Sequence, residues 1–165
     1  MIANKIITGF TEGFKLEFQG ERKNQFSHNL LSAQQLPLVI EAKLKKEINL
    51  GRIAGPFVYP PVTPLRVSPI GVIPKKKEGE YRMIQNLSYP AGDSVNEGIP
   101  QEFTSVHYAS VDDAIKLIKK LGRGCALVKT GIQSAFRIIP VHPADYALLG
   151  FQWQGKWYID RCLPM

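Results

Sequence analysis

Hydrophobic residues recur at every fourth position in the first third of the chain. Between residues 35 and 50, Leu36, Ile40, Leu44 and Ile48 fall on one side of a helix, and lysines fill the other side. This spacing is typical of an amphipathic helix that buries one stripe of side chains. Gly51 comes next and suits the position after a helix end. We predict a surface helix over residues 35–50 that docks through its stripe.

A second amphipathic helix is predicted over residues 111–121. Ser110 is a suitable N-cap, and Asp113 stands three residues later, as in a capping box. Gly122 marks the end of the helix. The apolar side of this helix consists of Val111, Ala114, Ile115, Ile118 and Leu121.

Strands are predicted where short apolar runs flank glycine-containing turns. Residues 70–73 and 83–84 enclose a charged tip around Gly79, which indicates a β-hairpin. Residues 146–153 and 156–163 enclose Gln154 and Gly155 and predict a second hairpin. The apolar run 125–128 predicts a buried strand. Residues 1–33 show no clear period, and we expect the aromatic residues of GFTEGF (9–14) to anchor an extended arm.

The composition is that of an ordinary globular protein with an excess of positive charge. Hydrophobic residues make up 44% of the 165 residues, and the formal net charge is +7. A basic balance favours a polyanionic partner, most often nucleic acid, although a merely basic domain has the same composition. Cys125 and Cys162 lack the spacing of a zinc site and are predicted to be buried thiols. No segment resembles a signal peptide or a membrane span, so we expect an intracellular protein that does not enter membranes.

Most of the chain resembles the reverse transcriptases of DIRS-type retroelements, which also carry a tyrosine recombinase. Several unusual phrases occur in the order and at the intervals of that family, and no single phrase would suffice. They are GRIAGPF (51–57), LRVSPIGVIPKKKEGEYRMIQNLSYP (65–90), SVNEGIP (94–100), VDDAIKLIKKLG (111–122) and IQSAFRIIPVHPADYALLGFQWQGKWYIDRCLPM (132–165). The resemblance implies an α+β, right-hand polymerase fold, with fingers and the beginning of the palm. It divides the chain into an arm and helix (1–54) and reverse-transcriptase-like fingers with a partial palm (55–165).

The resemblance also assigns a nucleotide-binding role to four residues. In such enzymes a lysine near the tip of the fingers hairpin and an arginine on its returning strand hold the incoming triphosphate. Lys75 or Lys76 and Arg82 match those places, and their charges suit a polyphosphate. Phe136 matches the aromatic residue that stacks under the sugar.

One catalytic position departs from the family pattern. The first palm motif of the family has an aspartate that bridges two divalent metal ions, and Gly131 stands in its place here. Glycine offers no side-chain oxygen, and Asp145 and Asp160 lie too far downstream to replace the ligand. We therefore expect no polymerase activity and no bound cofactor for this chain, although the intact family uses Mg²⁺.

The family's next palm motif begins with a phrase like LPMG, and the sequence stops at Leu163-Pro164-Met165. We therefore expect a fragment without a complete palm. Such a fragment would expose unpaired strand edges through which it self-associates, and it would keep affinity for a primer–template or a nucleoside triphosphate. Two alternatives remain open: a piece of a larger active polymerase, against which Gly131 counts, and a small basic interaction module. In the last case Lys76 and Arg82 contact an acidic protein or solvent.

Overall fold

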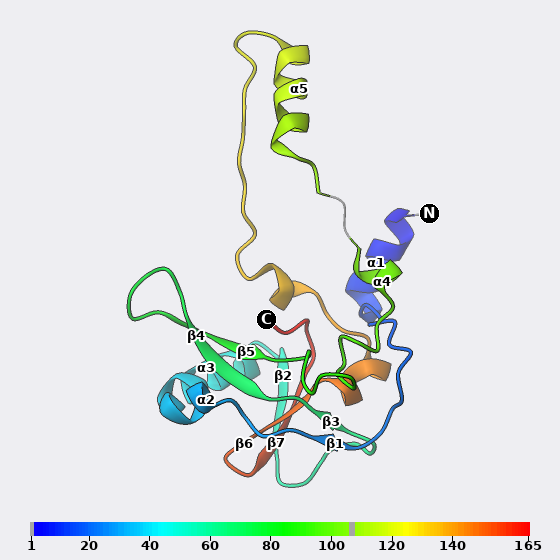
Figure 1. Cartoon of the computed structure of the whole chain (residues 1–165), viewed down its shortest axis with the longest axis vertical. Helices are drawn as coiled ribbons and strands as arrows, with labels where there is room; N and C mark the ends of the chain where they lie inside the picture. Colours follow the sequence, from blue (N-terminus) through cyan, green and yellow to red (C-terminus); the bar gives the residue numbers. More distant parts are fainter. Residues whose placement is uncertain (1, 106–107) are drawn as a thin grey trace.

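The computed structural model describes residues 2–105 and 108–165 and shows a mixed α/β protein (Figure 1). A compact body holds the strands, and one helix stands away from it. The helices are α1 (Ile2–Glu12), α2 (Leu31–Gln35), α3 (Pro37–Asn49), α4 (Gln101–Thr104) and α5 (Val111–Leu121), with 3-10 turns η1 (Ala135–Ile138) and η2 (Pro143–Leu148). The strands are β1 (Gln25–Phe26), β2 (Ile53–Phe57), β3 (Arg66–Val67), β4 (Ile70–Pro74), β5 (Tyr81–Gln85), β6 (Gly150–Trp153) and β7 (Lys156–Asp160).

The larger sheet has the strand order β1-β3-β6-β7-β2 and is mixed. β1 and β6 each run parallel to β3, whereas β7 is antiparallel to both β6 and β2. The hairpin predicted around Gln154 and Gly155 is confirmed as β6–β7. Gln154 and Gly155 both have positive φ angles, as a two-residue hairpin turn requires. Both arms are shorter than predicted, because β6 begins at Gly150 and β7 ends at Asp160. His142 caps η2 and Pro143 favours its first turn, so residues 146–148 belong to a 3-10 helix instead of a strand.

The hairpin predicted around Gly79 is confirmed as a separate two-stranded sheet of β4 and β5. Its register pairs Ile70 with Gln85 at the base and Pro74 with Tyr81 near the tip. Gly79 has φ +75° at the tip, where an open turn requires the left-handed region. The hairpin therefore projects a basic tip from a base that is buried in the body of the protein.

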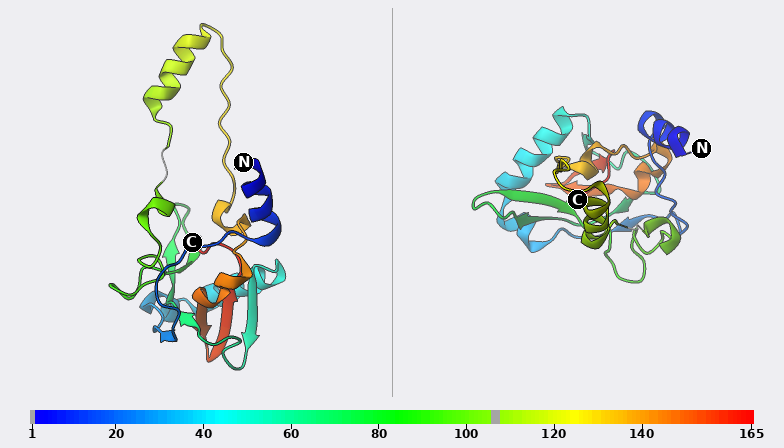
Figure 2. Two further views of the ribbon diagram at one scale, coloured as in Figure 1. Left: turned by 90° about the vertical axis from the view of Figure 1, so that its right-hand side faces the viewer. Right: turned by 90° about the horizontal axis from the view of Figure 1, so that it is seen from above.

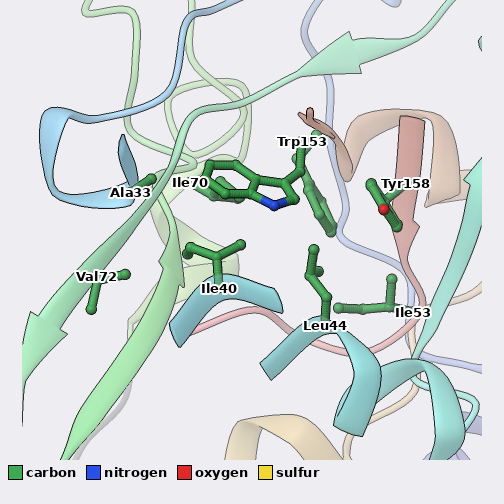
Figure 3. Packing of buried hydrophobic residues seen from close by; sticks show 9 residues of the cluster. Ala33, Ile40, Leu44, Ile53, Ile70, Val72, Trp153 and Tyr158 are labelled. Carbon is green, nitrogen blue, oxygen red and sulfur yellow. The ribbon is translucent and has the colours of Figure 1, made fainter. Parts of the chain in front are cut away.

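The main hydrophobic core lies between α3 and the two sheets (Figure 3). The predicted stripe is confirmed: Ile40 and Leu44 are buried, and Leu36 and Ile48 pack at the edge of the core. Figure 3 shows Ile40 and Leu44 on α3 facing Trp153 and Ile70. Burial of each such aliphatic side chain contributes about 1.5–3 kcal/mol. The core contains residues of the helices before residue 54 and of the strands after it. The predicted division into an arm with a helix (1–54) and fingers with a partial palm (55–165) stays a prediction.

The segment before α2 follows the surface of the body instead of forming a core of its own. Residues 2–12 form α1, a helix that the sequence pattern did not predict. Beyond it, Phe14 forms a bridge with Val141, and the Leu16 N–H donates to Asp145 Oδ2 at 2.8 Å. The arm expected to be extended is helical up to Glu12, and of its aromatic residues Phe10 is 51% exposed and meets Phe14 edge to face at 5.3 Å. Farther along, the Phe18 ring lies beneath the guanidinium groups of Arg22 and Arg66.

Helix α5 is confirmed, but the strand predicted after it is absent. Ser110 and Asp113 form the capping box, with the Asp113 N–H donating to the Ser110 hydroxyl at 3.1 Å. Figures 1 and 2 show α5 and the extended chain that follows it standing away from the body. The prediction of a buried strand at 125–128 is wrong here: Leu127 is 70% and Val128 87% exposed, and no described strand pairs with this run. Cys125 is therefore only half-buried, whereas Cys162 is buried as predicted.

Candidate functional site

A cavity of about 290 Å³ opens between α3, the β4–β5 hairpin and the chain around η1. It brings together segments that are far apart in the sequence. Its described lining residues are Lys43, Lys46, Glu47, Ile70, Lys75, Tyr81, Arg82, Met83, Gln85, Gln133, Ser134, Arg137, Phe151, Asp160, Pro164 and Met165. Lys75 and Arg82, to which the resemblance assigns a nucleotide-binding role, both line this cavity.

The basic side chains of the β4–β5 hairpin differ in whether a carboxylate contacts them. Lys75 and Lys77 both contact Glu80, at 3.2 and 2.9 Å, and the Lys75 N–H donates to the Glu80 carbonyl. Hydrogen bonds from Lys77 and then Lys75 lower the pKa of the Glu80 carboxyl. Among the described residues, neither Lys76 nor Arg82 has a carboxylate within 4.0 Å. These two side chains are therefore the hairpin cations that are open to an anionic ligand.

The four predicted nucleotide-binding residues do not all meet at one point. Lys76 does not line the cavity, but it lines a second groove on the hairpin together with Lys75 and Arg82. Phe136 is 58% exposed in η1 and does not line the cavity, although its neighbours Ser134 and Arg137 do. The structure therefore brings the three cations of the hairpin together and does not place Phe136 among the residues that line either space.

Gly131 lies in the exposed extended chain between α5 and η1. A Cβ atom at this position would meet no described atom within 4 Å, so the site has room for a larger residue but no oxygen ligand of its own. In the described part of the chain, no group of three or more His, Cys, Asp or Glu side chains could hold a metal ion. The residues around Gly131 therefore do not fit a pair of divalent metal ions.

The two downstream aspartates are both engaged in structural contacts. Asp145 is buried, accepts from the Leu16 N–H and forms an ion pair with Arg22. Asp160 is buried, accepts from Arg137 Nη1 at 2.6 Å and from the Cys162 N–H at 3.2 Å. Both carboxylates are therefore held by a buried or half-buried arginine and by a backbone N–H.

Sequence reasoning missed the buried charge cluster at the floor of the cavity. Arg137 contacts Asp160 at 2.6 Å and Glu47 at 2.9 Å, and its side chain is 5% exposed. Burial raises the pKa of the Asp160 carboxyl to about 6, against the opposing attraction of Arg137. Burial acts to lower the pKa of the guanidinium, but Asp160 and Glu47 outweigh it and raise that pKa. The sequence signal for this cluster is Arg137 itself, a charged residue between apolar residues in the run 136–139, since a charge in such a run needs a buried partner.

Sequence reasoning also left out Lys43 and Lys46 on α3, which line the cavity opposite the hairpin. The helical period places both lysines on the polar side of α3, which we predicted to face solvent. Their spacing of three residues puts them on one side of the helix, but only the tertiary structure shows what that side faces. Lys45, between them, does not line the cavity.

No protein-family model matches this chain, and no curated protein matches it either. Solved structures do match. The native protease–reverse transcriptase of prototype foamy virus is 19% identical, with a TM-score of 0.59 over 92% of this chain and 18% of that one. A selenomethionine-labelled CSH mutant of it has a TM-score of 0.62 at 18% identity. The foamy viral enzyme in complex with dsDNA has a TM-score of 0.53 at 20% identity, over 88% of this chain and 26% of that one.

These likenesses establish the fold class. The chain has a partial reverse-transcriptase-like fold, and it spans about a fifth of the length of the foamy virus proteins that it matches. At these identities the likeness concerns the fold alone. As for membranes, none of the described helices has the length and apolar character needed to cross a bilayer.

Proposed function

We propose that this chain is a fragment of a DIRS-type retroelement reverse transcriptase that binds a primer–template or a nucleoside triphosphate but does not polymerise DNA. The fragment corresponds to fingers and the beginning of the palm. The observation that carries the proposal is the cavity that joins Lys75 and Arg82 to the segment just after Gly131. In the reverse-transcriptase fold these two segments supply the phosphate-binding hairpin and the first palm motif.

The chemistry of the hairpin suits phosphate groups. Arg82 provides a planar set of donors that can hold two phosphate oxygens, and Lys75 and Lys76 provide mobile point charges beside it. Phe136 is exposed in η1, next in sequence to Arg137, which lines the cavity, and it offers a flat apolar surface for a sugar ring. These side chains bind and orient a charged ligand, and none of them needs a metal ion to do so.

The same site lacks the groups that phosphoryl transfer requires. A two-metal mechanism needs a carboxylate to hold the ions near the primer hydroxyl, and Gly131 has none. Asp145 and Asp160 are held by Arg22 and Arg137. The proposed activity is therefore binding without synthesis.

Nucleic-acid binding is supported by the net charge of +7 and by the foamy viral structures that contain dsDNA. The test is a fluorescence titration of a labelled primer–template at two salt concentrations. Binding through phosphates weakens steeply as salt rises, because condensed counterions are released. Lys76→Ala with Arg82→Ala should lower the affinity by about tenfold at low salt, since each lost phosphate contact removes roughly 0.5–1.5 kcal/mol.

The matched control is Lys156→Ala with Arg161→Ala. It removes the same charge from exposed positions of the β6–β7 region, outside the cavity. Equal losses in the two double variants would show that only net charge matters and would refute the role of the hairpin. An unmodified chain with no salt-dependent binding would favour the alternative, a basic interaction module without a nucleic-acid role.

A further inference from the structure

Helix α5 has an apolar face that the described part of the chain leaves exposed. The helix stands away from the body, and none of its residues is buried (Figures 1 and 2). On this face Val111 is 78%, Leu121 62% and Ile115 41% exposed. Leu127 and Val128 follow in the extended chain and are exposed as well. An apolar surface of this kind marks a site of contact with another molecule.

The charges beside the apolar face of α5 lie along one of its two edges. Asp112 and Lys119 are two helical turns apart and therefore lie on the same edge, whereas Leu121 lies on the opposite edge. Among the described residues, neither Asp112 nor Lys119 has an oppositely charged side chain within 4.0 Å. The ion pair within this helix joins Lys116 to Asp113 instead. One edge therefore carries a negative charge near its start and a positive charge near its end.

Two copies of α5 that pack face to face in opposite directions satisfy both features. A two-fold axis between antiparallel helices places each edge of one apolar face beside the same edge of the other. Asp112 of one copy then lies beside Lys119 of the second copy, and the symmetry repeats this pair. Parallel helices would place the charged edge against the apolar edge that carries Leu121. Charge complementarity therefore favours a second, antiparallel copy of this helix as the occupant.

We propose that α5 is a dimerisation helix through which two copies of this chain pair in antiparallel orientation. The helix has 11 residues and is about 16 Å long, so the contact is smaller than the roughly 800 Å² per partner of a standard interface. The dimer is therefore weak, with a dissociation constant on the order of 10–100 µM. The described residues that line the cavity between α3 and the hairpin include none from α5, so this inference does not depend on the proposed binding function.

The experiment is sedimentation velocity of the whole chain from about 1 to 200 µM, without nucleic acid, on Asp112→Lys and Lys119→Asp, first separately and then mixed in equal amounts. Each variant alone carries like charges along the whole edge, so its dimer should be roughly tenfold weaker than that of the unmodified chain. In the mixture the positive edge of one variant meets the negative edge of the other. A mixed dimer should therefore form with a dissociation constant within about threefold of the unmodified value.

The matched control is Lys120→Asp. It reverses the neighbouring charge on the side of α5 away from the apolar face, and it should change the dissociation constant less than about twofold. Because both positions lie in the last turn of α5, equal losses in Lys119→Asp and Lys120→Asp would show that only helix stability matters and would overturn the inference. An unmodified chain that stays monomeric overturns it as well. A mixture that stays monomeric while the unmodified chain dimerises overturns the antiparallel pairing.

Discussion

Replacing Arg137 with methionine should destabilise the protein strongly and in a pH-dependent way. Arg137 is the cation that holds Asp160 at 2.6 Å and Glu47 at 2.9 Å in the buried floor of the cavity. Methionine keeps much of the volume and removes the charge. The variant therefore leaves Asp160 buried beside no cation in contact with it.

The expected magnitude follows from this geometry. With an effective dielectric constant of about 20, two charges 2.6 Å apart attract by roughly 6 kcal/mol. The cost of burying both charges offsets part of that attraction, and removal of one partner from such pairs typically costs about 3–5 kcal/mol. A small domain is stable by about 5–15 kcal/mol, so the variant should lose a large share of its free energy of unfolding.

The pH dependence has a definite sign. The pKa of the Asp160 carboxyl is raised to about 6 in the folded protein, above its ordinary value of 3.8. The folded state therefore binds this proton more tightly than the unfolded state does, and the resulting stabilisation is complete below pH 3.8 and disappears as the pH rises through 6. Without Arg137 the pKa of Asp160 rises further. The loss caused by Arg137→Met should therefore be larger at pH 7.5 than at pH 5.

The assay is urea unfolding followed by tryptophan fluorescence at both pH values. Arg161→Ala is the matched control, because Arg161 is exposed and adjacent to Asp160, and it should change stability by less than about 0.5 kcal/mol. The double variant Arg137→Met with Asp160→Asn should be more stable than Arg137→Met alone at pH 7.5, because no buried charge remains at position 160. A loss below about 1 kcal/mol at pH 7.5, or an equal loss at both pH values, would refute the reasoning.

Three further outcomes are expected. On a primed RNA template the chain should synthesise no DNA with Mg²⁺ or Mn²⁺, because Gly131 provides no carboxylate; extension above a control without protein would contradict this. Ser110→Ala should weaken α5 by about 1 kcal/mol through loss of the capping box, seen as faster amide exchange in α5, and unchanged exchange would argue against the cap. The exposed apolar residues of α5 and of residues 125–128 should cause self-association that Val128→Lys reduces; a sedimentation coefficient independent of concentration would rule it out.

Local patterns predicted the elements whose stability depends on their own sequence. The stripe from Leu36 to Ile48, the cap at Ser110 and the turn at Gln154-Gly155 each became the expected element, because side-chain period, capping and φ preference act over a few residues. The fold class also followed from the sequence, through several ordered phrases that resemble reverse transcriptases. The nucleotide-binding role of Lys75 and Arg82 stays a prediction of that resemblance; the structure places Arg82 on β5 and Lys75 directly after β4.

Only the tertiary structure decided which side chains meet and which predicted elements find partners. The run 125–128 has the composition of a buried strand, yet a strand forms only where a neighbour pairs with its backbone, and no described strand does. Glu47, Arg137 and Asp160 come from three distant segments, so no local pattern could show that they neutralise one another. Lys43 and Lys46 lie on the polar side of α3, and only the tertiary structure shows that they line the same cavity as the β4–β5 hairpin. Sequence fixes what each segment can become, whereas contacts between distant segments determine what surrounds it, and binding depends on those surroundings.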